Sequence, residues 1–290
     1  MIERITTGQG FIAALDQSGG STPKALRGYG VDDSEWSGDD EMFGAIHAMR
    51  ARVITALSFA SGKVIGAILF EKTMDGVVDG QPTAEALKAR GVVPFIKVDE
   101  GLADEADGVQ LMKPMGKLPA LLEKSVAAGM FGTKMRSVIK SANPAGIAAI
   151  VAQQFEVAGQ ILDAGLVPMI EPEYDITAAD RAAGEEILLA EIMKHLDALP
   201  EGREVMLKLS IPVTPGLYTP LVSHPRVLRV VALSGGFSTD EACERLAQNP
   251  GMIASFSRGL LQDLRKGQSD AEFDAVLGKA IDQIAAASVA

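Results

Sequence analysis

The sequence has few of the residues that would indicate a secreted or nucleic-acid-binding protein. Cys243 is the only cysteine among the 290 residues, so the chain has no internal disulfide framework and no thiolate metal site. A lone thiol in an alanine- and leucine-rich helical pattern is usually a packing residue, and a nucleophilic role for Cys243 is the weaker interpretation. The formal net charge of -11 excludes the basic surface that is typical of nucleic-acid binding.

Long apolar runs and targeting patterns are also missing. No apolar run reaches about 18 uninterrupted residues, which is the length that a membrane-spanning helix needs. Residues 1–8 carry charges ahead of any apolar stretch and show no signal-peptide pattern. We therefore expect a cytoplasmic protein without membrane or nucleic-acid partners. The sequence leaves the oligomeric state open and is compatible with a homo-oligomer.

What the chain does contain is a regular alternation of short and long apolar patterns. Hydrophobic residues make up 47% and charged residues 22%, as in a globular protein with a large core. Runs of strand length predict strands at residues 11–16, 64–70, 92–98, 132–138, 166–171, 204–211, 228–234 and 252–257. Helical periodicity predicts helices at residues 40–60, 117–129, 144–164, 178–199, 239–248 and 271–287.

This alternation predicts the fold class. Nearly continuous apolar strands indicate a parallel sheet that is covered by helices. Eight of them favour an α/β fold that is a single (β/α)8 TIM barrel, with residues 1–290 as one domain. An open doubly wound sheet is the alternative, but residues 16–21 lack its G-x-G-x-x-G fingerprint. Residues 28–41 and 73–83 are expected to be long surface connections near the ligand site.

Charged and small polar residues lie at or near the carboxyl ends of the predicted strands, where a barrel builds its active site. Because strand ends converge on one rim, we expect these residues to share one pocket. They are Asp16, Glu71, Lys97, Asp99, Lys134, Arg136, Glu171, Glu173, Lys208, Ser234, Gly235, Gly236 and Arg258.

Lys208 lies in an apolar strand, where its ammonium group must leave water. Desolvation and the nearby cations Lys134 and Arg136 favour the neutral amine, which attacks a ketone to form an imine. Taken alone, Lys208 is more simply explained as a snorkelling or ion-paired lysine. The ionisable residues expected around it favour the catalytic interpretation.

Glu171 and Glu173 alternate along an extended strand, so their side chains lean to one face. Two carboxylates near a lysine can move protons, because their repulsion favours protonation of one of them. A catalytic metal is the rival hypothesis, but the histidines His47, His195 and His224 are isolated in the sequence. We therefore expect no metal.

Two further patterns suit phosphate binding. Lys134 and Arg136 alternate in the same way, and they either form a structural ion-pair network or bind a phosphate and tune proton transfer. Ser234-Gly235-Gly236 predicts a turn that leads into a helix N-terminus, where backbone amides bind phosphate. Such turns are also ordinary in barrels, so this signal is weak by itself.

The order of these motifs resembles that of the class I fructose-bisphosphate aldolases, particularly the short bacterial type, over residues 10–264. The segments that carry the resemblance are Ala13-Ala14-Leu15-Asp16-Gln17-Ser18, Ile96-Lys97-Val98-Asp99, Lys134-Met135-Arg136, Val167-Pro168-Met169-Ile170-Glu171-Pro172-Glu173, Leu207-Lys208 with Val213-Thr214-Pro215-Gly216, and Leu233-Ser234-Gly235-Gly236.

The resemblance implies reversible cleavage of fructose 1,6-bisphosphate, a step of glycolysis and gluconeogenesis, with no cofactor beyond a covalent imine on Lys208. It implies that Glu171, with Lys134 beside it, is the acid and base for carbinolamine formation and dehydration. Asp16 would handle protons around carbon–carbon cleavage, and Glu173 would hold the lysine network in place. The implied phosphate ligands are Ser234, Gly235, Arg258 and Gly259 for one phosphate, and Ser21, Lys97 and Arg136 for the other.

The sequence departs from the family pattern at several positions. Gln17 replaces an acidic residue, and Leu209 replaces the proline that often follows the imine lysine. Arg258 precedes Gly259, whereas the arginine of animal-type enzymes follows the glycine. The last residues also lack the tyrosine with which animal enzymes protonate the enamine, so the proton donor for that step stays open.

Two other classes of function remain as alternatives. Schiff-base barrels such as transaldolase and deoxyribose-phosphate aldolase share the lysine and the fold, but two phosphate clusters favour a bisphosphate. A barrel that only binds sugar phosphates or a partner protein is disfavoured by the intact set of Lys208, Glu171 and Asp16.

Overall fold

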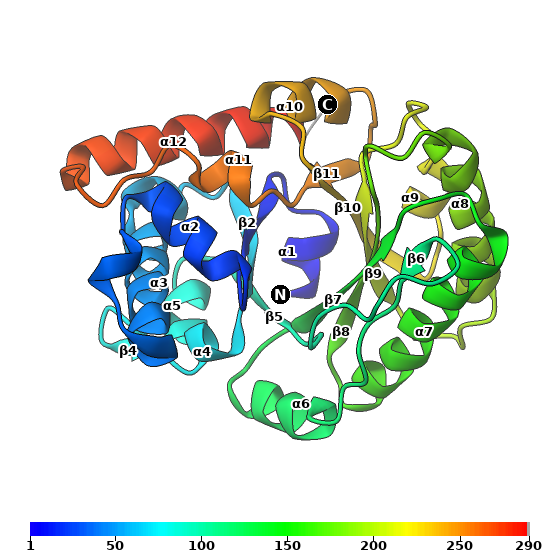
Figure 1. The fold of residues 1–290 in the computed structure, drawn as a ribbon, viewed down its shortest axis with the longest axis horizontal. Helices are drawn as coiled ribbons and strands as arrows, with labels where there is room; N and C mark the ends of the chain where they lie inside the picture. The colour runs from blue at the N-terminus through cyan, green and yellow to red at the C-terminus, as the bar shows by residue number, and fades with distance from the viewer. Residues whose placement is uncertain (289–290) are drawn as a thin grey trace.

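A computed structural model describes residues 1–288 as a ring of parallel strands surrounded by helices (Figure 1). The eight strands of the ring follow one another in sequence order. They are β1 (Phe11–Leu15), β2 (Val64–Leu69), β5 (Val93–Lys97), β7 (Gly132–Ile139), β8 (Val167–Tyr174), β9 (Val205–Ser210), β10 (Val227–Leu233) and β11 (Met252–Ala254). The predicted (β/α)8 barrel is confirmed, and the predicted strand ends differ from the observed ones by at most three residues.

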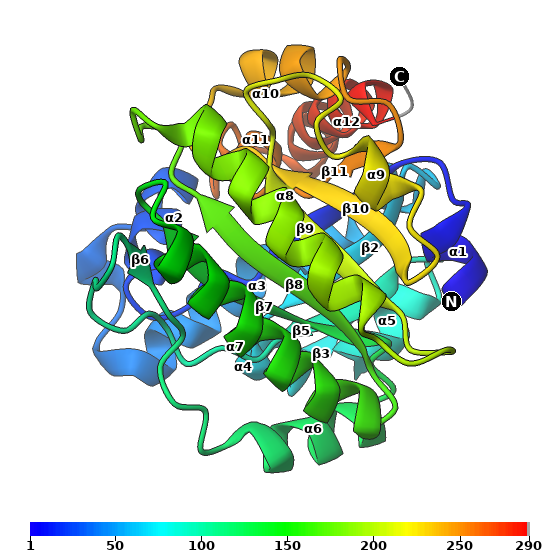
Figure 2. The same ribbon diagram turned by 90° about the vertical axis from the view of Figure 1, so that its right-hand side faces the viewer.

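The longer helices cover the outside of the ring, and α7 and α8 lie side by side across it (Figure 2). They are α2 (Ser21–Tyr29), α3 (Gly38–Thr55), α5 (Thr83–Lys88), α6 (Leu118–Ala127), α7 (Pro144–Asp163), α8 (Arg181–Asp197), α10 (Thr239–Leu246) and α12 (Asp270–Ala287). By length and composition α7 could cross a membrane, but it packs against β7 and β8 as a core helix.

The helices α2 and α5 were not predicted from periodicity. Several short elements were not predicted either. They are α1 (Ile2–Thr6), α4 (Glu71–Met74), α9 (Thr219–Val222), α11 (Arg258–Leu261), the 3-10 helices η1 (Asp33–Glu35) and η2 (Leu57–Ala60), and the strands β3 (Val77–Val78), β4 (Gln81–Pro82) and β6 (Val109–Gln110).

The two predicted surface connections are more structured than expected. Residues 28–41 contain the end of α2, all of η1 and the start of α3, and residues 73–83 contain the β3–β4 hairpin. The side chain of Asp32 caps η1, while Glu35 bonds back to the Asp32 amide. Such locally capped turns are too short to produce a periodic apolar pattern, which is why the sequence reads as a loop.

A separate apolar core fills the inside of the ring. Ile12, Phe95, Met169 and Met206 belong to it, and Ile5 of α1 joins it. Figure 1 shows α1 across the middle of the ring. Strand alternation brings every second side chain into the ring. These inward positions change from apolar to charged toward the carboxyl ends of the strands. The apolar layer therefore forms the floor of the site, and the charged residues lie above it at the carboxyl ends of the strands.

The ring is nearly closed, with a seam between β11 and β1. No ladder joins these two strands within residues 1–288; the Ala14 amide donates instead to the carbonyl of Phe256 at 3.2 Å. Just beyond it, the Gln17 side chain donates to the hydroxyl of Ser257. The two loops that carry Asp16 and Arg258 are thus fastened to each other by side chains.

The ring of Phe95 fills space that two glycines leave open. A Cβ atom at Gly66 would lie 3.2 Å from the Phe95 ring, and one at Gly132 would lie 3.0 Å from it. We predict that Phe95→Ala lowers the free energy of unfolding by about 3–5 kcal/mol, because the strands cannot collapse onto the cavity. Urea titration measures this loss. The exposed Val126→Ala control should change stability by less than about 0.5 kcal/mol, and a similarly small effect at Phe95 would contradict this packing.

Candidate active site

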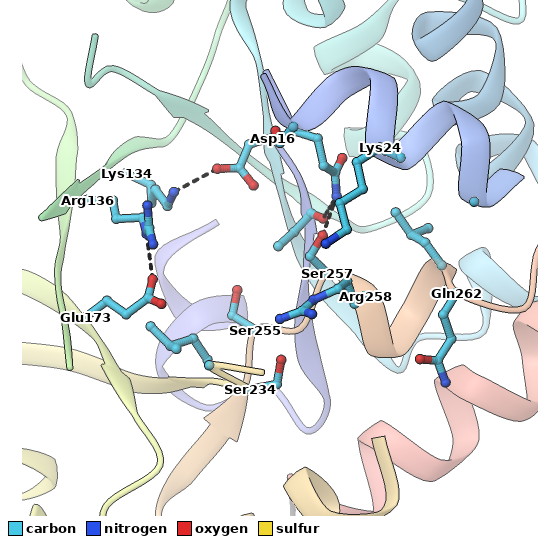
Figure 3. Close-up of a pocket in the computed structure, with 18 of the residues that line it drawn as sticks. Asp16, Lys24, Lys134, Arg136, Glu173, Ser234, Ser255, Ser257, Arg258 and Gln262 are labelled. Carbon is cyan, nitrogen blue, oxygen red and sulfur yellow. Dashed lines mark hydrogen bonds and ion pairs between the residues drawn. The ribbon is translucent and has the colours of Figure 1, made fainter. Parts of the chain in front are cut away.

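Nearly all of the predicted site residues line one cavity at the carboxyl ends of the strands. The cavity has a volume of about 560 Å³, and every residue with an expected catalytic or phosphate-binding role except Lys97 and Gly259 lines it. The expectation of one shared pocket is wrong for Glu71, Lys97 and Asp99, which line a second cavity, and Gly236 does not line the main cavity. Figure 3 shows charged side chains entering it from β7 and β8 on one side and from α2 and α11 on the other. Residues more than 200 positions apart in sequence therefore meet in one chamber, as the barrel topology predicts.

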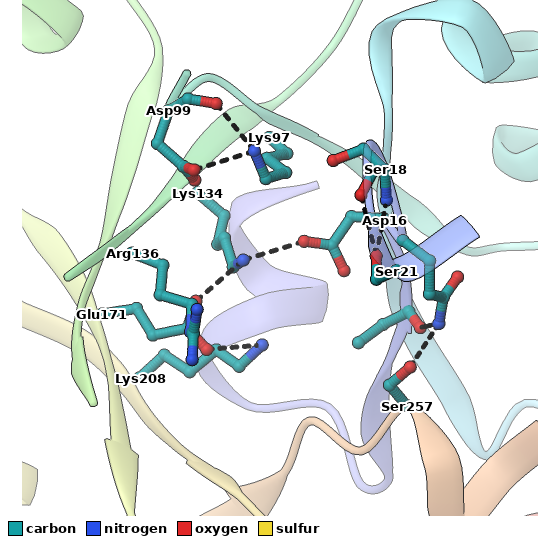
Figure 4. A network of polar contacts seen from close by, with 12 residues as sticks. Asp16, Ser18, Ser21, Lys97, Asp99, Lys134, Arg136, Glu171, Lys208 and Ser257 are labelled. Carbon is teal, nitrogen blue, oxygen red and sulfur yellow. Dashed lines mark hydrogen bonds and ion pairs between the residues drawn. The ribbon is translucent and has the colours of Figure 1, made fainter. Parts of the chain in front are cut away.

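Two lysines and two carboxylates form a buried network at the bottom of this cavity (Figure 4). Lys134 Nζ lies 2.8 Å from Asp16 Oδ2 and 2.8 Å from Glu171 Oε2. Lys208 Nζ lies 3.0 Å from the other carboxylate oxygen of Glu171. The side chains of Lys134, Glu171 and Lys208 are at most 5% exposed, so Glu171 connects the two ammonium groups away from solvent.

Burial and the neighbouring charges shift the pKa values of this network in opposite directions. Burial alone would raise the pKa of Asp16, but the charges of Lys134 and Lys208 hold it well below its usual range. Burial would likewise lower the pKa of Lys134, whereas Asp16 and Glu171 raise it well above its usual range. Asp16 is therefore an ionised carboxylate and Lys134 a permanent ammonium group.

The second carboxylate of β8 has a different partner. Glu173 Oε2 lies 2.5 Å from Nε of Arg136, and both side chains line the cavity. The two residues reach each other because Lys134 and Arg136 alternate on β7 in the same way as Glu171 and Glu173 on β8. Glu173 thus contacts the guanidinium group rather than the lysine amines.

The predicted phosphate turn lies beside the predicted arginine. A Cβ atom at Gly236 would lie 3.6 Å from a guanidinium nitrogen of Arg258, and one at Gly235 would collide with Ile176 at 2.5 Å. Both glycines have positive φ angles, 61° and 132°, so only glycine gives this turn its shape. The Ser238 side chain then caps α10, as the sequence pattern predicts.

The other predicted phosphate cluster is divided between two cavities. Arg136 and Ser21 line the main cavity, but Lys97 lines a neighbouring one of about 640 Å³ together with Ser18 to Gly20. There Lys97 Nζ contacts Asp99 Oδ1 at 2.8 Å and the Asp99 carbonyl at 2.7 Å. Glu71 also borders this second cavity and pairs with Lys124 at 2.9 Å.

Comparison with known proteins shows the family and the fold of the chain. The family model of class-I fructose-bisphosphate aldolases matches residues 2–228. The chain belongs to this family. It is also similar in fold to the fructose-bisphosphate aldolase of Plasmodium falciparum, solved in complex with TRAP and a small-molecule inhibitor. The TM-score is 0.77 at 19% identity, over 99% of this chain and 92% of that one.

A second solved structure shows a weaker likeness. Cgl0159 from Corynebacterium glutamicum matches with a TM-score of 0.55 at 15% identity, over 99% of this chain and 91% of that one. At such identities the likeness concerns the fold. The chemistry of this chain, which belongs to the class I aldolase family, depends on its own site residues.

Two cations in or near the main cavity were not predicted from the sequence. Lys24 of α2 lines the main cavity, and neither it nor Arg258 forms an ion pair within residues 1–288. The fully buried Arg50 of α3 donates to the Gln17 side chain at 3.2 Å and to Thr73 Oγ1 at 2.7 Å, which fixes the loop after Asp16. Both residues lie on helices, where a lone cation carries no pattern that distinguishes it from surface residues.

The other reactive residues lie elsewhere. Burial raises the pKa of the Cys243 thiol to about 11, which makes it a poor nucleophile at neutral pH. Within residues 1–288, no three side chains of His, Cys, Asp or Glu gather in the geometry of a metal site. His195 stacks on Phe155, and His224 contacts Asp197.

The ion pair of Asp16 predicts a pH dependence of stability. Because the folded-state pKa of Asp16 lies below its ordinary value of 3.8, the ionised carboxylate stabilises the fold above that value. The contribution is lost as the pH falls through the folded pKa. Asp16→Asn should lower the free energy of unfolding at pH 7 by roughly 1–3 kcal/mol, less than for a fully broken buried pair because Lys134 keeps Glu171.

Urea titrations of both proteins between pH 7 and pH 3 measure this difference. It should stay constant down to about pH 5 and shrink below about pH 4, because Asp16 becomes protonated in the unfolded wild-type chain while it stays ionised in the folded protein. A difference that grows on acidification would show that the ionised Asp16 does not stabilise the fold.

Proposed function

We propose that this chain is a metal-independent fructose-1,6-bisphosphate aldolase that forms dihydroxyacetone phosphate and glyceraldehyde 3-phosphate through an imine on Lys208. The observation that carries the proposal is the buried carboxylate of Glu171 between two lysine amines, at 2.8 Å and 3.0 Å. An imine-forming enzyme needs this combination of a buried amine and an adjacent group that moves protons.

The contacts favour Lys208 over Lys134 as the nucleophile. Lys134 contacts two carboxylates, whose charges raise its pKa and keep it protonated. Lys208 contacts one carboxylate, and the passage of one proton to Glu171 over 3.0 Å would leave a neutral amine beside a neutral acid. That transfer separates no charge within the apolar floor of the barrel, so it is compatible with burial.

The reaction then proceeds in balanced steps. The Lys208 amine adds to the C2 carbonyl, Glu171 protonates the C2 oxygen, and loss of water gives an iminium ion. The ionised Asp16 accepts the C4 hydroxyl proton while the C3–C4 bond breaks, and the bonding electrons enter the iminium to form an enamine. Glyceraldehyde 3-phosphate leaves, C3 of the enamine takes up one proton in exchange for the proton that Asp16 accepted, and water releases dihydroxyacetone phosphate from Lys208. Because the iminium takes up the electrons, no metal or other cofactor is required in this mechanism.

The two ends of the cavity differ in their capacity to bind phosphate. Arg258 and Lys24 have no carboxylate partners in the described chain and line the same cavity as Ser234 and Gly235, and Arg258 lies beside the turn at Gly236. We assign the phosphate next to the ketone to this end, with Gly259 at the start of α11 beside it. At the other end, the second phosphate has to compete with Glu173 for Arg136, and Lys97 has to leave Asp99 and the neighbouring cavity to reach it.

The remaining expectations belong to the same proposal. The partners are small phosphorylated sugars, the physiological context is glycolysis or gluconeogenesis, and the protein works in the cytoplasm without a nucleic-acid or membrane partner. Within residues 1–288, the one helix of suitable length and composition for a membrane is α7, and it packs against β7 and β8, which is compatible with a protein that has no membrane partner.

Borohydride reduction tests the imine directly. We predict that dihydroxyacetone phosphate with borohydride labels Lys208, because only an imine is reduced to a stable secondary amine. Lys208→Met should abolish the label and lower kcat by at least about a thousandfold, as for other groups that act in the chemical step. Peptide mapping by mass spectrometry identifies the labelled lysine. Labelling of Lys134, or loss of activity with a chelator, would overturn the mechanism.

Arg258→Ala tests the assignment of the phosphate ends. Because hydrogen bonds to charged groups contribute roughly 1.5–3 kcal/mol, kcat/KM should fall about tenfold to a hundredfold for fructose 1,6-bisphosphate and for fructose 1-phosphate. Lys97→Met should lower kcat/KM for the bisphosphate alone. Equal rates for the bisphosphate and for deoxyribose 5-phosphate in the wild type would instead support a different Schiff-base aldolase.

A further inference from the structure

A fully buried glutamine behind the active site contacts the backbone of the central carboxylate residue. Gln154 is on α7, on the outer side of β7 and β8, and its side chain has no exposed surface. Its Oε1 accepts the backbone N–H of Glu171 at 2.8 Å, and its Nε2 donates to the hydroxyl of Ser137 on β7 at 2.6 Å. One side chain therefore ties together the two strands that carry Lys134 and Glu171.

On the side of β9, the strand around Glu171 has little other backbone support, although its ladder with β7 runs from Val167 to Tyr174. Pro168 and Pro172 lie on either side of Glu171 in β8 and cannot donate hydrogen bonds. The ladder between β8 and β9 ends at the pair Ile170 and Leu207, one residue before Glu171 and Lys208. Support on the β9 side resumes only where Ser210 bonds both the amide and the carbonyl of Tyr174, at 3.0 Å and 2.8 Å. Glu171 thus lies in a gap of the ladder between β8 and β9.

We propose that Gln154 is a positioning residue that fixes the Glu171 carboxylate between the two lysines. The inference rests on the proposed function and assigns to the hydrogen bond a role beyond stability. A buried N–H group without an acceptor is strongly unfavourable, so β8 has to shift toward another acceptor when Gln154 is removed. Such a shift would change the distance from Glu171 to Lys208, over which the proton moves.

The neighbouring residue offers a matched control. Gln153 is on the same helix and also makes two hydrogen bonds, in which it accepts the Met112 amide at 2.9 Å and donates to the Met112 carbonyl at 3.0 Å. Gln153→Met and Gln154→Met thus remove the same groups from adjacent positions, and only one of them touches Glu171. Ser137→Ala is a milder variant, which removes one anchor of Gln154 but keeps the acceptor for Glu171.

The experiment compares the rate of imine formation across pH in the wild type and the three variants. Dihydroxyacetone phosphate is the probe, and the imine is quenched with borohydride. Gln154→Met should slow the step about tenfold to a hundredfold, because a displacement of about 1 Å costs that much in rate. It should also shift the pH profile by at least half a unit. Gln153→Met should overlay the wild type, and Ser137→Ala should lie between them.

The outcomes separate the positioning role from a structural one. A Gln154→Met protein that is less stable to urea but forms the imine at the wild-type rate and pH profile overturns the proposal. So does a Gln153→Met protein with the same kinetic defect. If Gln154→Met fails to fold, a wild-type rate and pH profile in Ser137→Ala overturn the proposal, and a slower, shifted profile supports it. A wild type that forms no imine overturns the proposed function itself, and the positioning role with it.

Discussion

The contact of one buried carboxylate, Glu171, with two ammonium groups governs the architecture of the site. Charges taken out of water destabilise a protein unless they are paired, and in this site the two lysines Lys134 and Lys208 pair with the two carboxylates Asp16 and Glu171. Lys208 extends the network by a single contact, so it is the member that can give up a proton with the least loss of pairing. Lys134 has two carboxylate partners and stays a cation, whereas Lys208 has one and is the candidate nucleophile.

The barrel supplies the geometry that makes this network possible. Parallel strands bring their carboxyl ends to one rim, and the apolar layer of Phe95, Met169 and Met206 beneath keeps water from the other side. Precision comes from polar side chains rather than from the ladder alone, because β8 contains prolines and the ring has a seam. Gln154 supports Glu171 from behind, and Gln17 joins the loops of Asp16 and Arg258 at the seam.

The strands and the inward charges could be predicted from the sequence because both follow simple periodicities. Lys134, Arg136, Glu171 and Glu173 alternate in short apolar runs, where a charge is conspicuous. Lys24 and Gln154 could not be predicted, because polar residues on helices are common and their partners lie on strands far along the chain. The separation of Lys97 from the main cavity was also beyond prediction, since it depends on the rotamer that its contact with Asp99 selects.

We propose that Lys208 forms the covalent bond with the substrate, that Glu171 moves protons for this step, and that Lys134 stays a cation. A crystal structure of the wild-type protein soaked with dihydroxyacetone phosphate tests this most directly. The account predicts continuous density between Lys208 Nζ and C2 of the ligand, with Glu171 in hydrogen-bond contact with the reacting atoms and Lys134 still paired with Asp16. Density that joins the ligand to Lys134, or a ligand bound without any covalent link to a lysine, would contradict it.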